Sequence, residues 1–70
     1  MTLAEFVGDK VRAAREAKGW TQVGLAQLMD RDAAWITKIE NGHQVPTLQS
    51  ALALANVLGV TVDHLVGRVL

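Results

Sequence analysis

Residues 20–42, which read WTQVGLAQLMDRDAAWITKIENG, constrain the fold of this 70-residue chain more than any other stretch. Apolar residues recur at helical spacing on both sides of a break at residues 30–32, and the second run stops at Gly42. Asp is a common helix cap, and glycine readily adopts the left-handed conformation that ends a helix. The stretch therefore predicts two short helices joined by a tight turn, over about residues 21–42.

Signals of the same kind predict five helices in all. Each expected start has a Thr or Asp whose side chain can accept a hydrogen bond from a free backbone N–H of the first turn. Three of the expected ends have a glycine. The expected helices run over about residues 3–18 after a Thr2–Glu5 capping box, from the Thr21 cap to residue 29 or 30, from the Asp32 cap to Gly42, from the Thr47 cap to Gly59, and over about residues 62–68 after the Thr61 cap.

The apolar stripes of these helices predict a single core. A chain this short holds one domain at most, and its many alanines and leucines, with one proline and few aromatics, favour helix over sheet. We therefore predict one all-α domain over residues 1–70. The side chains expected inside are Leu3, Phe6, Val7, Val11 and Ala14; Trp20, Leu25, Ala26 and Met29; Ile36 and Ile39; Leu48, Leu52, Ala55 and Leu58; and Leu65, with Val62 and Val66 beside it.

The composition narrows the possible functions. There is no cysteine, and the only histidines, His43 and His64, are far apart in sequence, so no metal site is predicted. The chain has no glycine-rich phosphate loop, and its only serine, Ser50, has no histidine and acid beside it, so we expect neither a cofactor nor an enzyme. With no signal peptide and no apolar run of roughly 18 residues, we expect a cytoplasmic protein without a membrane partner.

The chain resembles the Cro/phage-repressor type of helix-turn-helix domain, the XRE-like family, over nearly its whole length. The resemblance is carried by WTQ at 20–22, LAQLM at 25–29, ITKIENG at 36–42, PTL at 46–48 and LANVLGVTVDHL at 54–65. It implies a compact five-helix, lambda-repressor-like fold. It also implies a transcriptional regulator, repressor-like, that binds double-stranded DNA sequence-specifically as a homodimer with its third helix in the major groove.

The resemblance implies roles for individual residues as well. It places Thr21, Gln22 and Asn41 near DNA phosphates. It also implies a partly buried ion pair between Arg15 and Glu40, which would tie the first helix to the end of the third. Such a pair acts mainly on geometry, because breaking one side costs more than the intact pair contributes.

The outward face of the third helix maps onto Ala33, Ala34, Trp35, Thr37 and Lys38. Thr37 and Lys38 are candidate readers of base edges or phosphates, whereas the alanines can only touch a thymine methyl. For Trp35 two interpretations stay open, because the indole either lies exposed at this binding surface or packs on a neighbouring helix.

Residues around the third helix complete the candidate site. Asp30 stands where many family members have glycine, and Asp tolerates the left-handed backbone better than most residues. Arg31 either contacts a phosphate or pairs with Asp30 or Asp32. His43, in the following loop, is expected near the DNA backbone.

A protein-interaction module, such as an antitoxin that binds a toxin, is the main alternative. It would use Ala33, Ala34 and Trp35 as an apolar patch, and it agrees with a net charge of zero, since nonspecific DNA binding depends on neutralising phosphates. A surplus of apolar residues separately predicts self-association. The surplus consists of Val23 and Leu28, and of Val57, Val60, Val66, Val69 and Leu70 near the C-terminus.

Overall fold

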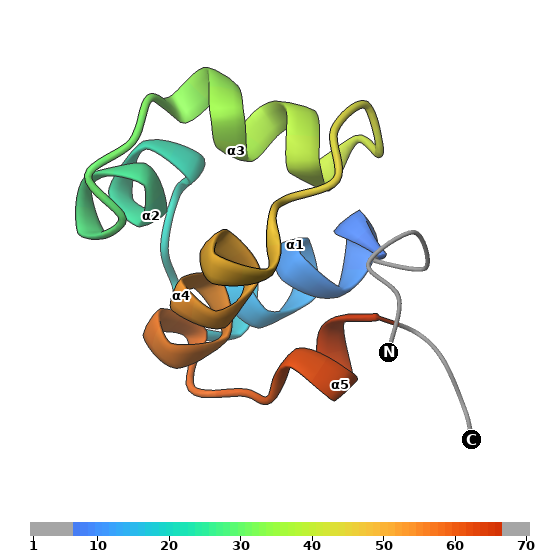
Figure 1. Cartoon of the computed structure of the whole chain (residues 1–70). Helices are drawn as coiled ribbons and strands as arrows, with labels where there is room; N and C mark the ends of the chain where they lie inside the picture. The colour runs from blue at the N-terminus through green and yellow to red at the C-terminus, as the bar shows by residue number, and fades with distance from the viewer. Residues whose placement is uncertain (1–6, 67–70) are drawn as a thin grey trace.

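The computed structural model describes residues 7–66. Within this range the chain forms five helices and no strand (Figure 1). They are α1 (Gly8–Ala17), α2 (Gln22–Leu28), α3 (Ala33–Glu40), α4 (Leu48–Leu58) and α5 (Val62–Leu65). α3 runs along the outside of the molecule beside α2, while α1, α4 and α5 lie beneath it (Figure 1). The predicted all-α, five-helix fold is confirmed.

One core joins all five helices. Its fully buried side chains are Val11, Leu25, Ile36, Ile39, Leu54 and Leu65. Burying an aliphatic side chain of this size contributes about 1.5–3 kcal/mol, so these contacts hold α3 on the rest of the domain. Further predicted core residues are confirmed as buried, namely Ala26, Ala55, Leu58, Val62 and Val66, or as half-buried against the core, namely Ala14, Trp20 and Met29.

The first helix begins later than predicted. Val7 has an extended backbone (φ −111°, ψ 109°) and donates its N–H to the carbonyl oxygen of Leu65 at 2.9 Å, so the helix starts at Gly8 and not at residue 3. A Cβ at Gly8 would overlap the carbonyl oxygens of Ile39 and Glu40. Only glycine allows α1 to begin this close to the end of α3. Thr2, Leu3, Glu5 and Phe6, which were expected to begin the helix, lie outside the described residues.

The inward stripe of α4 also differs from the prediction. Leu48 and Leu52 were expected inside, but each is 54% exposed, and Ala51 and Leu54 are fully buried in their place. An α-helix turns about 100° per residue, so Leu52 lies roughly a quarter turn from Ala51. Both stripes have helical spacing, and only the packing of α4 against its neighbours selects one of them.

The apolar surplus expected near the C-terminus is smaller than predicted. Val66 is buried, Val57 and Val60 are half-buried against the core, and Val69 and Leu70 lie outside the described residues. The large apolar side chains that are exposed in the described part of the chain are Val23, Leu28, Val45, Leu48 and Leu52. Val23 and Leu28 are therefore exposed as predicted, whereas Val66, which was expected both in the core and in the surplus, belongs to the core alone.

Three threonines cap helices as predicted. The hydroxyl oxygens of Thr21, Thr47 and Thr61 accept hydrogen bonds from backbone N–H groups three residues later, at 2.9–3.1 Å. Asp32 occupies the N-cap position of α3 as predicted, although its side chain makes no capping hydrogen bond. The last helix ends at Leu65, earlier than the expected residue 68.

Candidate nucleic-acid interface

α2 and α3 form a helix-turn-helix unit. The turn bends at Asp30, whose φ is 55°, the only positive φ of a non-glycine residue within residues 7–66. The backbone N–H of Arg31 donates to the carbonyl oxygen of Ala26 at 2.9 Å and closes the turn. The expected left-handed aspartate is confirmed, and the turn leaves α3 on the outside of the molecule (Figure 1).

The predicted ion pair between Arg15 and Glu40 is confirmed. Nε of Arg15 lies 2.7 Å from Oε2 of Glu40, and Nη2 lies 3.1 Å from Oε1, which gives a two-pronged contact. The side chain of Glu40 is fully buried and that of Arg15 is 10% exposed. Nη1 of Arg15 also donates to the carbonyl oxygen of Trp20 at 2.7 Å. One arginine thus joins α1, the entrance of α2 and the end of α3.

Glu40 accepts hydrogen bonds from two further donors that the sequence did not predict. Nε2 of Gln22 donates to Oε1 of Glu40 at 3.0 Å, and Nε of Arg12 lies 3.4 Å from the same oxygen. Arg12 also reaches Asn41, donating from Nη2 to Oδ1 at 3.1 Å. Their positions in the sequence, 18 and 28 residues before Glu40, carry no local signal of this contact.

These donors decide the ionisation of Glu40. Burial alone raises the pKa of the Glu40 carboxyl, but the hydrogen bonds from Arg15, Gln22 and Arg12 and the charge of Arg15 outweigh it, so the pKa lies below its ordinary value. The hydrogen bond to Glu40 in turn raises the pKa of Arg15. Both groups are therefore charged at neutral pH.

Gln22 and Thr37 link the two helices of the unit. The hydroxyl of Thr37 lies 2.8 Å from Oε1 of Gln22 and 3.2 Å from the carbonyl oxygen of Ala33, and can donate to either. Gln22 is half-buried. Its amide nitrogen donates to Glu40, and its amide oxygen accepts from Thr37. Its orientation is thus set by the protein.

The exposed face of α3 has few polar groups. Ala34 and Lys38 are exposed, whereas Ala33 and Thr37 are half-buried. Exposed Asn41 and His43 follow at the C-terminal end of the helix, and exposed Thr21 caps α2. Lys38 is the one residue of α3 in the described structure with a formal charge at the surface. Contact of these residues with DNA stays a prediction.

Trp35 does not belong to this exposed face. It is 9% exposed and forms part of the core, so packing on neighbouring helices is the correct interpretation and its placement on the outward face is wrong. The guanidinium of Arg31 covers the indole, with Cζ 4.3 Å from the ring centroid. Nη2 of Arg31 donates to Oγ of Ser50 at 2.9 Å.

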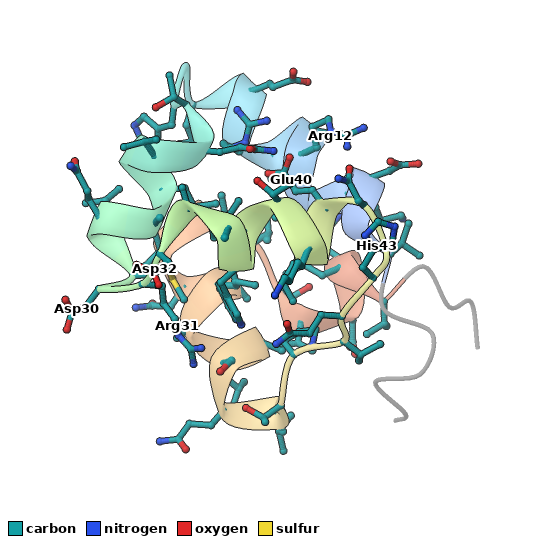
Figure 2. All side chains as sticks on the ribbon, turned by 90° about the horizontal axis from the view of Figure 1, so that it is seen from above. Arg12, Asp30, Arg31, Asp32, Glu40 and His43 are labelled. Atoms are coloured by element: carbon teal, nitrogen blue, oxygen red, sulfur yellow. The ribbon has the colours of Figure 1, made fainter. Side chains whose placement is uncertain are left out.

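Arg31 therefore pairs with neither of its acidic neighbours among the described residues. In Figure 2, Asp30 points away from the domain, and Arg31 extends from the same turn toward α4. Arg12, Glu40 and His43 lie at the other end of α3 in this view.

Residues 7–66 contain neither a candidate metal site nor a candidate membrane span. No group of three or more His, Asp or Glu side chains in this part of the chain is placed to hold a metal ion. No helix of the same part is both long and apolar enough to cross a membrane.

The sequence and the fold are similar to those of known proteins. A family profile described as a helix-turn-helix domain matches residues 7–66. The uncharacterized HTH-type transcriptional regulator YazB of Bacillus subtilis is 34% identical over 62 residues, which cover 89% of this chain and 90% of that protein. The crystal structure of the restriction-modification controller protein C.AhdI from Aeromonas hydrophila superposes with a TM-score of 0.78 at 33% identity, covering 90% of this chain and 94% of that one. The biofilm regulator SinR, solved in complex with DNA, gives a TM-score of 0.78 at 27% identity, covering 84% and 98%.

Proposed function

This chain belongs to the helix-turn-helix domain family, in its Cro/phage-repressor type, and we propose that it is a transcriptional regulator that binds double-stranded DNA in a sequence-specific manner. In this proposal α3 enters the major groove and α2 lies across the backbone, as in other helix-turn-helix proteins. The related proteins named above are regulators, and one of them was solved on DNA. Such a regulator works where its DNA is, which we take to be the cytoplasm.

The observation that carries the proposal is the way α3 is held. Its inner face is fully buried through Ile36 and Ile39, and its C-terminal end is fixed by the Arg15–Glu40 pair, while Lys38 projects to the surface. A helix held so rigidly and exposed along one side can enter a groove without reorganising, which favours affinity. The contact with α1 at Gly8 adds to this rigidity.

The proposed contacts divide into two kinds. Lys38 reads a guanine edge or meets a phosphate, and Ala33 and Ala34 touch thymine methyl groups. A second set holds the backbone and carries no direct sequence information. This set consists of Thr21, Gln22, Arg31, Asn41 and His43, with Thr37 acting through its hydrogen bond to Gln22.

We further propose that the protein binds as a repressor-like homodimer. Two-fold symmetric operators present half-sites roughly 34 Å apart, one turn of the duplex. The described domain measures 32 × 21 × 19 Å, so two copies fit side by side at that spacing. Exposed Leu48 and Leu52 on α4 offer apolar surface that a second copy would cover.

The protein-interaction alternative loses its main support. It relied on Trp35 as an exposed apolar residue beside Ala33 and Ala34, and Trp35 is buried. The remaining pair of alanine methyl groups makes too small an apolar surface to anchor a toxin or another protein partner.

Selection from a random duplex library tests the proposed function. We expect the bound pool to converge on one two-fold symmetric sequence. The selected duplex should bind far more tightly than random duplex, and affinity for both should fall steeply with salt. A pool that never converges, together with salt-independent binding, would refute sequence-specific DNA recognition.

A further inference from the structure

Arg31, in the turn before α3, is held at two points. The face of the Arg31 guanidinium stacks on the indole of Trp35, with Cζ 4.3 Å from the ring centroid. Its edge donates from Nη2 to Oγ of Ser50 on α4 at 2.9 Å. Ser50 is itself buried, and its hydroxyl also lies 3.1 Å from Oγ1 of Thr47. Stacking and a hydrogen bond from two different helices therefore hold one exposed arginine in one orientation.

This arrangement leaves most of the donors of Arg31 free. A guanidinium has five N–H groups, and the bond to Ser50 is the one side-chain hydrogen bond of Arg31 among residues 7–66. No carboxylate of the described residues lies within ion-pairing distance of it, although Asp30 and Asp32 are its neighbours in sequence. Stacking occupies the face of the guanidinium and leaves its edge available to an anion.

The α4 side of Arg31 fits an anion, whereas its other side borders a hollow lined by Gln27, Asp30 and Asp32. On the α4 side it borders a groove between α3, the following loop and α4, whose apolar lining includes Trp35 and Pro46 and whose polar lining includes Gln44, Thr47 and Gln49. This lining holds amide and hydroxyl donors but no acidic residue. An extended Arg31 thus lies on the α4 side of α3, away from the Glu40 end of the helix (Figure 2).

We propose that Trp35 and Ser50 position Arg31 to grip a DNA backbone phosphate on the α4 side of the recognition helix. Trp35 then acts on DNA binding through Arg31, without touching DNA. This inference rests on the proposed function, which counts Arg31 among the backbone contacts, and it adds the two residues that position Arg31. A phosphate fits better than a base because Arg31 lies in the turn before α3 and extends toward α4, not along the exposed face that carries Lys38.

The test compares single and double variants by titrating DNA affinity against salt. Arg31→Ala should weaken binding to the selected and to the random duplex by the same factor, roughly tenfold, and lower the salt slope by about one. Trp35→Leu keeps an apolar side chain in the core but removes the stacking surface. It should weaken DNA binding in the parent and have no further effect in the Arg31→Ala background. Ser50→Ala should behave in the same way, and it tests the positioning of Arg31 if Trp35→Leu does not fold.

Arg31→Lys separates charge from geometry. It should keep the salt slope but lose affinity, since an ammonium neither stacks flat on an indole nor donates two parallel hydrogen bonds to one anion. Circular dichroism and thermal unfolding report the folded fraction of every variant. If Arg31→Ala lowers the thermal midpoint while the DNA affinity and salt slope of the folded protein are unchanged, Arg31 only packs over Trp35 and the inference is overturned. If the unaltered protein binds no duplex, both the proposed function and this inference are refuted.

Discussion

The hydroxyl of Thr37 lies 2.8 Å from the side-chain amide oxygen of Gln22, so the middle of α3 is joined directly to the first residue of α2. The opposite end of the same amide donates to Glu40 at 3.0 Å. A residue expected to meet a DNA phosphate is thus oriented in advance by two side chains of α3. This contact makes the position of Gln22 dependent on α3.

Gln22→Ala should weaken binding to all duplexes alike, because phosphate contacts carry no sequence information. Thr37→Val keeps the shape of the side chain and removes the hydroxyl, so it should release the amide of Gln22 and cost about 1 kcal/mol of binding, or roughly fivefold. Filter binding on selected and random duplexes measures both. In a Gln22→Ala background, a further loss from Thr37→Val would contradict an effect transmitted through the amide.

Removing one side of the buried pair should destabilise the fold. Glu40→Ala or Arg15→Ala should lower the free energy of unfolding by about 3 kcal/mol, because the partner left behind is a buried charge without its counter-ion. Arg12 still reaches Glu40 at 3.4 Å, so Arg15→Ala should be the milder change. Denaturant unfolding measures the loss. Glu16→Ala, on the exposed side of α1, should stay within about 0.5 kcal/mol of the parent.

Acid should destabilise the domain through Glu40. The pKa of Glu40 lies below its ordinary value in the folded protein, so the unfolded state binds a proton more readily. A fall in pH therefore stabilises the unfolded state relative to the folded one. The stabilisation is fully present above the pKa of the unfolded chain, about 4.3, and is lost as the pH falls through the lower folded value. Unfolding curves between about pH 3 and 6 should show this loss in the parent and in a Glu16→Gln control, and less of it in Glu40→Gln.

Lys38 should contribute to DNA binding from the exposed face of α3. If Lys38 meets a phosphate, Lys38→Ala lowers the salt slope by about one; if it meets a guanine, the variant loses preference at one base pair. Lys18→Ala is the matched control, because the ammonium of Lys18 lies beside Gly59 at the end of α4 and not on α3. Equal effects of the two substitutions would mean that Lys38 acts only through overall charge.

Self-association should be visible in solution. Sedimentation over a wide concentration range should show a monomer–dimer equilibrium, and a two-fold symmetric operator should bind two copies. Leu52→Glu places a charge on the apolar surface of α4 and should shift the equilibrium to monomer, whereas Leu28→Glu on α2 should not. A strict monomer in solution that also binds the operator singly would rule out the homodimer.

Local signals in the sequence specify where most helices start and stop, and with them the fold. The caps at Thr21, Thr47 and Thr61 and the left-handed turn at Asp30 depend on side chains and backbone preferences within three or four residues, so a short stretch of sequence contains the whole interaction. The Arg15–Glu40 pair spans 25 residues, and it was predicted only through the resemblance to a family.

Packing between the helices selects which of several locally equivalent side chains face inward. The stripe through Leu48 and Leu52 has the same helical spacing as the buried one through Ala51 and Leu54, and the direction of Trp35 depends on α4 and on Arg31. Local spacing specifies a helix but not the neighbour against which it packs. That choice is made by the apolar area buried and by hydrogen bonds between residues far apart in the chain, which become defined only once the helices have met.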